Sequence, residues 1–580
     1  MIKIPRHAST SAFHKWIPWL AGIFAATLLF ALLAIYAGFQ YSASDDTPIL
    51  RSFMGYEGGV PARFHPYTHT AFAWLLHGLA LIFPGVAWFS ILQLFLIWFS
   101  CVVLMKSMTQ MALNHGLPLF AGILGGVVFL TVYGLYIGCR ISYTTTAALT
   151  GASAVAQLMS IQWRGGQVLR GMLLSIALLM CCYCLRQISL LPSMVFWLLA
   201  LALVIIKFPQ RAKPALLGLL IGALGFCLLA GAWALEIKAL GQEDYLQWQK
   251  ARTGLFDYTQ FTQNTSPELV EEAGWSQSEF QLISQWFFMN QNISTEAFDM
   301  LYSAQPETAA ATFLSFFSQK LPHAIQTLLS FYAANPSYFF AAGLLCLIAL
   351  LSLLRLQSGR LSPLFAPLGL LLCAAILYYL AYQRRLPMRA AVSAIFPCAA
   401  FQFCLCLSCQ KEAGKPPRRA RAIIALICFC ALGLAALSLS QTIPLLKRPS
   451  APEAKSRSAI PADLDAAALE NPEYLIIYDF SLVADQRLFP DTSKGIPLNL
   501  MFWGGWPARS PSWLYQLSQY GIDGDALDGS VFLRDNVLFA SIYEEPGKAF
   551  LSYVGESAED DISWSVHSKQ GDIHIFKLYR

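Results

Sequence analysis

The sequence predicts a mainly α-helical, polytopic membrane bundle that carries a small α/β domain at its C-terminal end. Its 580 residues are 56% hydrophobic and only 13% charged, and the mean hydropathy is +0.51, values that are unusual for a soluble domain. About eleven apolar segments approach the roughly 20 residues that a membrane-spanning helix needs. Segments with a strand-like pattern occur between residues 442 and 580.

The first predicted span has no cleavage-site pattern after its apolar run, which is too long for a signal peptide, so we expect it to remain in the protein. The predicted spans are 16–39, 86–106, 118–138, 143–161, 171–187, 190–206, 214–236, 337–355, 362–382, 390–408 and 422–441.

The distribution of Lys and Arg predicts a cytoplasmic N-terminus, because short cytoplasmic loops collect both residue types. The inner connections then carry Lys106, Arg164, Arg170, Lys207, Arg211, Lys213, Arg355, Arg360, Lys411, Lys415, Arg418, Arg419 and Arg421. The cations of the short outer connections are all arginines: Arg51, Arg63, Arg140, Arg186, Arg384, Arg385 and Arg389. Arginine binds phosphate through two parallel hydrogen bonds, which favours a phosphate ligand, although arginines at helix ends also reach toward the membrane surface without binding one.

Segment 66–83, "PYTHTAFAWLLHGLALIF", is apolar, but Pro84-Gly85 follows it directly. Counting it as a span would reverse the charge bias of all later connections. We therefore expect a helix that lies on the outer membrane surface. The predicted domains are a transmembrane domain at 1–441, with outer loops 40–85 and 237–336, and an extracytoplasmic α/β domain at 442–580.

The two larger outer regions have different patterns. Region 237–336 contains helical patterns such as "SQSEFQLISQWFFMN" and "TAAATFLSFFSQKLPHAIQTLLSFY" and is too apolar for a disordered linker. Region 442–580 begins with a linker and a short helix, followed by strand-like runs "YLIIYDF", "SVFLRDNVLFASIY", "AFLSYV" and "IHIFKLY", with a helical "PSWLYQLSQYG" between them.

The stretch "YSASDDTPIL" places two adjacent carboxylates, Asp45 and Asp46, at the edge of the first span. One interpretation is that Asp46 caps the next helix, with Pro48 in its first turn. That interpretation accounts for one aspartate only. It does not explain the polar residues that follow within about 25 positions, which are candidates for substrate binding: Arg51, Glu57, Arg63, His65 and His69.

A carboxylate pair suits a hard cation such as Mg²⁺ or Mn²⁺, which takes oxygen ligands together with phosphate oxygens. His65 and His69 are poor zinc ligands because Pro66 predicts a helix start between them. All fourteen cysteines lie in or beside predicted spans, so we expect no outer disulfide framework. The sequence contains no Walker A, GxGxxG, HExxH or GxSxG pattern, which leaves nucleotide-driven transport and serine hydrolysis without support.

Taken together, these parts resemble the GT-C superfamily of integral-membrane glycosyltransferases. The likeness is carried by "SDDTPILRSFMGYEGG", by "HPYTHTAFAWLLHGLALIFPGVAWFSILQ" and by shorter patches: "YTTTAAL", "KARTGLFDY", "EEAGWSQSEFQLISQWFFMN", "QRRLPMRAA" and "NLMFWGGWPARSPSW". Uncharacterised bacterial multi-span proteins of this type are the most similar. The resemblance implies transfer of a sugar from a polyprenyl-phosphate carrier.

The resemblance also implies roles for individual residues. Asp45 or Asp46 would be the catalytic carboxylate, acting as general base or metal ligand, and Arg384, Arg385 and Arg389 would bind the lipid phosphate. Many members of the superfamily carry a second acidic motif after the third span, where this sequence reads "CRISYTTTA" without an acid. Catalysis with Mg²⁺ or Mn²⁺ and catalysis without a metal therefore both remain open.

Two further groups of residues are weaker candidates for substrate binding. Arg252 with Asp257 and Tyr258 is alternatively a salt-bridged anchor of the large loop. Trp503 and Trp506 are alternatively packed aromatic residues at a turn rather than a platform for sugars.

The predicted function is that of a bacterial inner-membrane glycosyltransferase whose outer-face site modifies a cell-envelope glycan, lipid or protein. We expect the lipid bilayer and a polyprenyl-phosphate sugar as partners, and no nucleic acid. The alternatives are a lipid-linked glycan transporter and a non-catalytic envelope assembly protein. Transporters gather ionisable residues near the membrane midplane, whereas the predicted spans contain almost no internal charge.

Overall fold

The computed structural model describes residues 12–42, 45–162, 167–306, 320–355, 364–383, 386–408, 418–446, 451–483 and 486–580. The chain divides into two compact units, which we describe separately. The first, which we call the bundle unit, comprises Met1–Phe39, Gln93–Leu228 and Pro322–Arg448. The second, the sheet unit, comprises Gln40–Leu92, Leu229–Leu321 and Pro449–Arg580. The predicted domain boundary at residue 441 stays a prediction.

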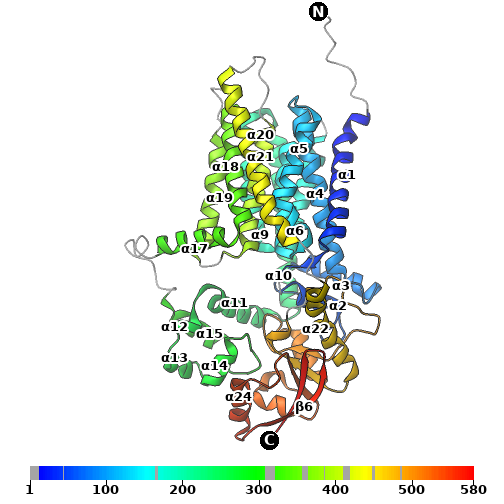
Figure 1. Cartoon of the computed structure of the whole chain (residues 1–580), viewed down its shortest axis with the longest axis vertical. Helices are drawn as coiled ribbons and strands as arrows, with labels where there is room; N and C mark the ends of the chain where they lie inside the picture. The colour runs from blue at the N-terminus through cyan, green and yellow to red at the C-terminus, as the bar shows by residue number, and fades with distance from the viewer. Residues whose placement is uncertain are drawn as a thin grey trace, which may run out of the picture. The chain divides into compact units, whose positions relative to one another are not determined.

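Ten described helices are long and apolar enough to cross a membrane, which confirms a polytopic helical membrane protein. Among those in the bundle unit, α18 packs against α20 and α21, and the three run side by side in Figure 1. The bounds of the ten described helices are α1 (Ala12–Tyr36), α4 (Trp88–Asn114), α5 (Leu119–Phe129) continued by η1 (Leu130–Gly134) and α6 (Leu135–Cys139), α8 (Gln167–Leu185), α9 (Gln187–Lys207), α10 (Ala212–Ala239), α18 (Pro336–Arg355), α19 (Phe365–Tyr382), α20 (Met388–Leu407) and α21 (Arg418–Leu446).

The remaining predicted span, 143–161, corresponds to helix α7 (Tyr143–Ser160), which is too polar to meet the same hydropathy criterion. All of its residues are buried, and it packs against α8, α9 and α20. A helix that protein surrounds on every side need not be apolar, because its polar side chains can bond to neighbouring helices instead of facing lipid. A hydropathy criterion alone therefore misses α7. The prediction of a helix at this place is confirmed.

A line of hydrogen bonds, which we call the polar seam, joins α4 to α7. Its members on α4 recur every seven residues and are Gln93, Ser100, Ser107 and Asn114. Their partners on α7 are, in the same order, Thr146, Thr150, Gln157 together with Ser160, and the carbonyl oxygen of Ser160. The donor–acceptor distances run from 3.2 Å, between the hydroxyls of Ser100 and Thr150, to 3.5 Å, between Ser107 and Gln157. Seven-residue spacing keeps all four α4 residues on one helix face, so the seam fixes how the two helices align.

Lys106 lies beside this seam, and its position differs from the one that we predicted. We expected it at the inner end of a span that finishes at residue 106, but α4 continues to Asn114. Lys106 is only 9% exposed, its Nζ donates to Oε1 of Gln157 at 2.9 Å, and it lies 5.4 Å from the centre of the Trp19 ring. The bundle unit therefore does hold a buried cationic side chain inside a span.

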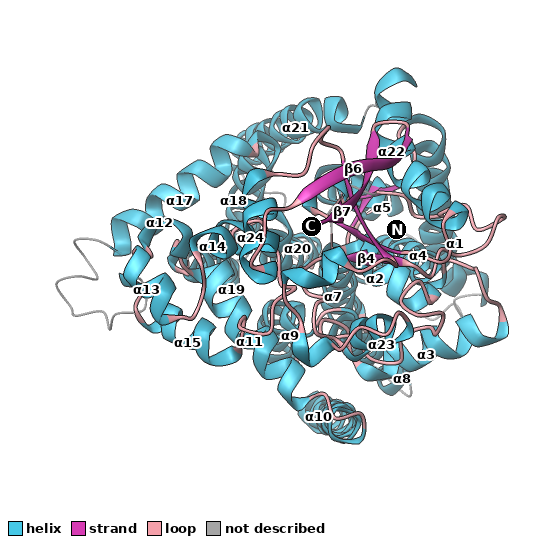
Figure 2. Cartoon of the chain, turned by 90° about the horizontal axis from the view of Figure 1, so that it is seen from below, coloured by secondary structure: helices cyan, strands magenta, loops and turns pink. Residues whose placement is uncertain are grey.

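The sheet unit contains a five-stranded mixed sheet in the order β4-β3-β5-β7-β6. Strand β3 pairs in parallel with β4 and with β5, whereas β7 is antiparallel to both β5 and β6. Helix α22 (Ala451–Glu470) lies against β6 and β7 (Figure 2). The strands are β3 (Leu475–Tyr478), β4 (Leu500–Phe502), β5 (Val537–Ser541), β6 (Ser563–Gln570) and β7 (Ile573–Tyr579). The predicted α/β character of the C-terminal region is thus confirmed.

One local prediction in this region is wrong, and two strands were not predicted. The run "AFLSYV" is not a strand but part of helix α24 (Lys548–Ala558), where Phe550, Tyr553 and Val554 are buried at helical spacing. Strand β4 is three residues long and β6 is mostly polar and exposed, so neither gave a strand signal. The predicted strands at β3, β5 and β7 and the predicted helix α23 (Pro511–Gln519) are confirmed.

Helices from the large loop share one hydrophobic core with the sheet. Phe287 lies edge-on to Trp503 at 5.3 Å between ring centres, and Trp503 stacks on Phe539. A side chain at Gly504 would place its Cβ 1.6 Å from the carbonyl oxygen of Trp286, so only glycine allows this approach. The loop helices are α11 (Glu243–Tyr258), α12 (Phe261–Asn264), α13 (Pro267–Glu272), α14 (Gln277–Ile283) and α15 (Thr295–Ser303), and α17 (Leu321–Ala334) follows them.

The first loop contains α2 (Asp46–Met54) and α3 (Thr70–Ile82). Helix α3 confirms that segment 66–83 forms a short apolar helix, because 13 residues extend about 20 Å and a hydrocarbon core is about 30 Å thick. Its start was wrong by a few residues. The helix begins after His69, whose Nδ1 accepts the backbone N–H of Ala71, and not between His65 and His69.

We predict that replacing Gln157 with Leu destabilises the protein by about 3 kcal/mol, because Lys106 then loses the oxygen that accepts its buried hydrogen bond. Replacing Lys106 with Met in the same chain should recover most of that loss, since no unpaired cation remains. Thermal unfolding of the wild type, both single variants and the double variant in the same detergent measures the interaction free energy between the two side chains. Additive single effects would show that the two side chains do not depend on each other.

Candidate functional site

The two adjacent carboxylates of the first loop lie at the start of α2 in different surroundings. Asp45 occupies the cap position with helical backbone angles, makes no side-chain capping bond and is partly exposed. Asp46 is the first residue of the helix and is fully buried. The alternative interpretation of Asp46 as the helix cap is therefore wrong. Both carboxyl groups still lie at the N-terminal end of the helix, where the helix dipole is positive.

Asp465 joins three distant segments of the sheet unit. Its two oxygens accept hydrogen bonds from Arg51 of α2 at 3.0 Å and from Arg487 at 2.8 Å. The Arg51 guanidinium also lies 5.0 Å from the centre of the Tyr56 ring. All three ion-paired side chains are largely buried, so the carboxylate replaces the water that the two cations would otherwise need. This ion pair fixes α2 to α22.

Glu57 is a titratable group at a cavity wall. Its carboxylate accepts a hydrogen bond of 2.5 Å from Oγ of Ser512, and both Glu57 and Arg51 line a small cavity of about 40 Å³. Burial raises the pKa of Glu57 to about 7, while the Ser512 hydrogen bond acts in the opposite direction. A carboxyl group that titrates near neutral pH can accept or release a proton during a reaction.

A second cleft is lined by Gly58 and by side chains of the α/β region, which include the carboxyl group of Glu473, three amides and one aromatic ring, that of Tyr520. Gln516 lines both spaces and is only 1% exposed. Its Nε2 donates to the carbonyl oxygens of Leu498 and Leu500, which fixes the orientation of the amide. Its buried Oε1 has no hydrogen-bond partner within the described part of the chain, so an acceptor remains available there.

His65 and Arg252 belong to one buried polar and aromatic cluster. The His65 ring lies edge-on to Trp506 at 4.3 Å between ring centres, and its Nδ1 accepts the backbone N–H of Tyr67. Arg252 donates to the Tyr67 hydroxyl at 2.9 Å and, through Nε and Nη2, to Oε1 of Gln249. Arg252 is 2% exposed and lies 5.3 Å from the centre of the Trp286 ring. Neutral partners and an aromatic face thus surround its charge.

The cluster extends to the end of α10. Arg63 forms an ion pair of 2.9 Å with Glu236, which also accepts from Trp74 Nε1. His69 donates through Nε2 to the carbonyl oxygen of Leu229, because its Nδ1 is already an acceptor. Desolvation lowers the pKa of His69, so the ring is neutral at pH 7. These contacts give Arg63 and His69 partners that hold the first loop in place.

The remaining candidates of the sheet unit lie apart from these groups. Trp503 is 3% exposed and enclosed by Phe287, Phe539 and Phe550, so its ring has no open face in this conformation. Asp257 and Tyr258 end α11 and are partly exposed. Sequence reasoning missed Asp465, Arg487, Ser512, Gln516, Tyr67 and Gln249, which carry no motif and become visible only through their contacts.

Arginines also gather at one end of the bundle unit. Arg186 precedes α9 and lies 5.2 Å from the centre of the Tyr143 ring at the start of α7. Arg389 is in the first turn of α20, whose Ser393 contacts Ser189 of α9 at 3.3 Å between hydroxyl oxygens. Helices α7, α9 and α20 therefore begin together. Arg384 and Arg385 lie outside the described residues.

No group of three or more His, Cys, Asp or Glu side chains within the described ranges is arranged to hold a metal ion. The thirteen cysteines that the structure describes are free thiols. The predicted Mg²⁺ or Mn²⁺ therefore stays a prediction for Asp45 and Asp46.

No family model and no curated protein matches the sequence. Among solved structures, the chain is similar to the crystal structure of ArnT from Cupriavidus metallidurans bound to undecaprenyl phosphate. The likeness covers 98% of each chain with 11% sequence identity and a TM-score of 0.45. A likeness at this level assigns neither a family nor an activity to this chain.

We predict that replacing Asp465 with Ala destabilises the sheet unit by about 3 kcal/mol or more, because two largely buried guanidinium groups then lose the carboxylate that they share. Asp465→Asn keeps one acceptor oxygen and should lose less. Tryptophan fluorescence during thermal unfolding of the whole chain measures both. Glu470→Ala on the same helix is the control. It removes only an exposed hydrogen bond to Gln570, so its stability should stay within about 0.5 kcal/mol of the wild type.

Proposed function

We propose that the protein is a membrane glycosyltransferase that transfers a sugar from a polyprenyl-phosphate-linked donor to a cell-envelope acceptor on the outer face of the membrane. The observation that carries this proposal is the folding of the first loop. It brings Asp45, Asp46 and Glu57 into one compact unit with the large loop and the α/β region. Glu57 in particular has a pKa near 7 at a cavity wall.

Transfer from a lipid phosphosugar makes two chemical demands. The departing phosphate needs cationic groups to stabilise its charge, and the acceptor hydroxyl needs a base to take its proton. Asp45, which is partly exposed at the start of α2, and Glu57 are the carboxylates suited to the base role. Arg389, with Arg186 beside α20, is suited to the phosphate role. Arg384 and Arg385 keep their predicted role as further phosphate ligands.

Gln516 supports a carbohydrate as the acceptor rather than a lipid or protein. A sugar offers hydroxyl groups that donate hydrogen bonds, and the free Oε1 of Gln516 is a fixed acceptor. The cleft that it lines has a volume of about 490 Å³, which lies in the range of small-molecule sites. Tyr520 and Asn536 in the same cleft add an aromatic face and an amide.

A divalent cation, where one takes part, would be held by Asp45 and Asp46 together with oxygens of the donor phosphate. Two carboxylates suffice for Mg²⁺, which commonly keeps several water ligands. Such a cation would neutralise charge on the leaving phosphate, and a metal-free reaction would leave this task to the arginines. Transfer measured after EDTA treatment, with and without added Mg²⁺ or Mn²⁺, separates the two mechanisms.

We predict that Asp45→Asn lowers transfer of labelled sugar from a polyprenyl-phosphate donor by about 10² to 10⁴-fold if Asp45 is the base. Arg389→Ala should lower it by about tenfold or more through loss of a phosphate contact. The matched controls are Asp561→Asn and Arg170→Ala, two exposed residues of the same types. Asp46→Asn tests the buried neighbour. A wild-type protein that transports a lipid-linked glycan but consumes no lipid-linked sugar would contradict the proposal.

We predict a pH dependence that comes from Glu57. Because its pKa is about 7 and a base acts when deprotonated, the rate of transfer should rise with pH up to about 7 and then level off. Glu57→Gln should remove this rise of the rate with pH. Ser512→Ala removes a hydrogen bond that lowers the pKa, so it should move the midpoint to higher pH. An unchanged profile in both variants would show that another group titrates.

A further inference from the structure

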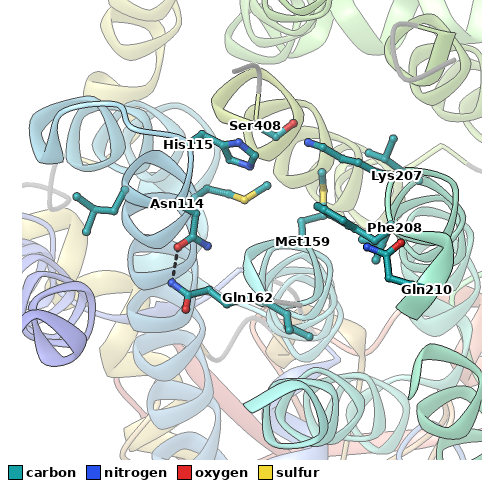
Figure 3. Close-up of a pocket in the computed structure, with 13 residues that line it drawn as sticks. Asn114, His115, Met159, Gln162, Lys207, Phe208, Gln210 and Ser408 are labelled. Carbon is teal, nitrogen blue, oxygen red and sulfur yellow. Dashed lines mark hydrogen bonds between the residues drawn. The ribbon is translucent and has the colours of Figure 1, made fainter. Parts of the chain in front are cut away.

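The bundle unit contains a cavity of about 460 Å³ at the end where α4, α7, α9 and α20 finish. We call it the Lys207 cavity (Figure 3). It is lined by Met159 and Ile161 at the end of α7, by His115 after α4, by Lys207 at the end of α9 and by Ser408 after α20. Tyr143, at the other end of α7, is about 27 Å away along the helix axis, so the cavity is separate from the arginines proposed to bind the donor.

The lining divides into an apolar part and a polar part. Met111, Met159, Leu203, Val204 and Phe208 supply the apolar surface. Among the described residues that line the cavity, Lys207 is the only formally charged side chain. Figure 3 shows the Lys207 amine pointing toward His115 and Ser408. A ligand that fills this space would carry an apolar portion and an anionic group.

His115 gives a second, independent indication of a ligand. Its buried Nδ1 has no hydrogen-bond partner among the described residues. Burial, followed by the nearby Lys207 charge, lowers the pKa of His115 to about 4, so the ring is neutral at pH 7. A neutral imidazole can donate one N–H, and an ammonium group has three N–H donors. The cavity therefore offers donors from two helices to one anionic group.

Four helix C-termini surround the cavity, and their partial negative charges oppose an anion. The basic residues of the connecting segments at this end outweigh the effect of the helix dipoles. Residues 162–170, 207–213 and 408–421 contain one acid, Glu412, against the basic residues Arg164, Arg170, Lys207, Arg211, Lys213, Lys411, Lys415, Arg418, Arg419 and Arg421. Full charges of one sign in this number attract anionic groups, and basic clusters beside spans are typical of anionic lipid binding.

We propose that the Lys207 cavity binds a phosphate ester, namely the phosphate-bearing headgroup of a membrane lipid, with Lys207 and His115 as donors and the methionine-lined wall against the acyl chain. The same phosphate chemistry could come from a water-soluble phosphate ester, and the experiment below separates the two sources. This binding does not depend on the proposed transfer activity, because it occupies the opposite end of α7.

The test uses the full chain in detergent and counts retained phospholipids by native mass spectrometry. We expect the wild type to retain phosphatidylglycerol in preference to phosphatidylcholine. Lys207→Gln should weaken retention by about tenfold or more through loss of a charge-assisted hydrogen bond. Gln210→Glu changes an exposed lining residue, so it should fold normally and weaken retention by adding a negative charge.

The matched control is Lys213→Gln, which removes the same charge from an exposed position that does not line the cavity. It should retain the lipid within about twofold of the wild type, and thermal unfolding should show that all variants fold. If lipid retention fell equally in the Lys207 and Lys213 variants, general attraction to the basic surface would explain it, and the proposal would be overturned. Equal retention of diacylglycerol, which has no phosphate, would overturn it as well.

Glycerol 3-phosphate then separates the two phosphate sources. If it displaces phosphatidylglycerol from the wild type at millimolar concentration, the phosphate group alone is recognised and a soluble ester is sufficient. If it does not displace the lipid while Lys207→Gln still lowers retention, the acyl chain contributes to binding and the ligand is a lipid. Both results support phosphate binding by Lys207.

Discussion

The structure of the bundle unit depends on one constraint, which is that α7 is buried from end to end although it contains four Thr, two Ser and one Gln. A buried polar group costs free energy unless it is hydrogen-bonded, and inside a membrane no water can make up the difference. The polar seam meets this demand by aligning four α4 residues with four of α7. Any sliding or rotation of α7 would break several of these bonds together. The seam therefore fixes α7, and α7 in turn fixes α9 and α20, which pack against it.

The same constraint organises the first loop of the sheet unit. This segment has only two short helices, yet Asp46, His65 and His69 are fully buried. It gains its order from partners that are hundreds of residues away in the sequence, such as Asp465 for Arg51 and Ser512 for Glu57. Because each such contact satisfies a buried polar group, the position of the candidate carboxylates depends on the C-terminal region being folded.

The sequence was sufficient for features that depend on average composition and insufficient for those that depend on particular partners. Apolar length predicted the spans, since lipid imposes it directly, and β3, β5 and β7 were predicted because buried strands are continuous apolar runs. The run "AFLSYV" is as apolar as a strand, and only its packing against β5 and its neighbours makes it helical. Lys106 looked like a loop residue because its acceptor, Gln157, lies on another helix. Asp465, Ser512 and Gln516 have no distinguishing neighbours in the sequence at all.

These contacts also distinguish the candidate residues by the role that each can take in the proposed reaction. Arg51, Arg63 and Arg252 each contact a carboxylate, an amide or an aromatic ring, so using them for a substrate would first require breaking an existing interaction, which is largely buried for Arg51 and Arg252. Glu57 differs, because its environment holds its pKa near 7 and leaves both protonation states accessible. Asp45 differs as well, since it is partly exposed at the N-terminal end of α2. In the function that we propose, the two carboxylates therefore take part in the chemistry, and the arginines around them hold the first loop in position.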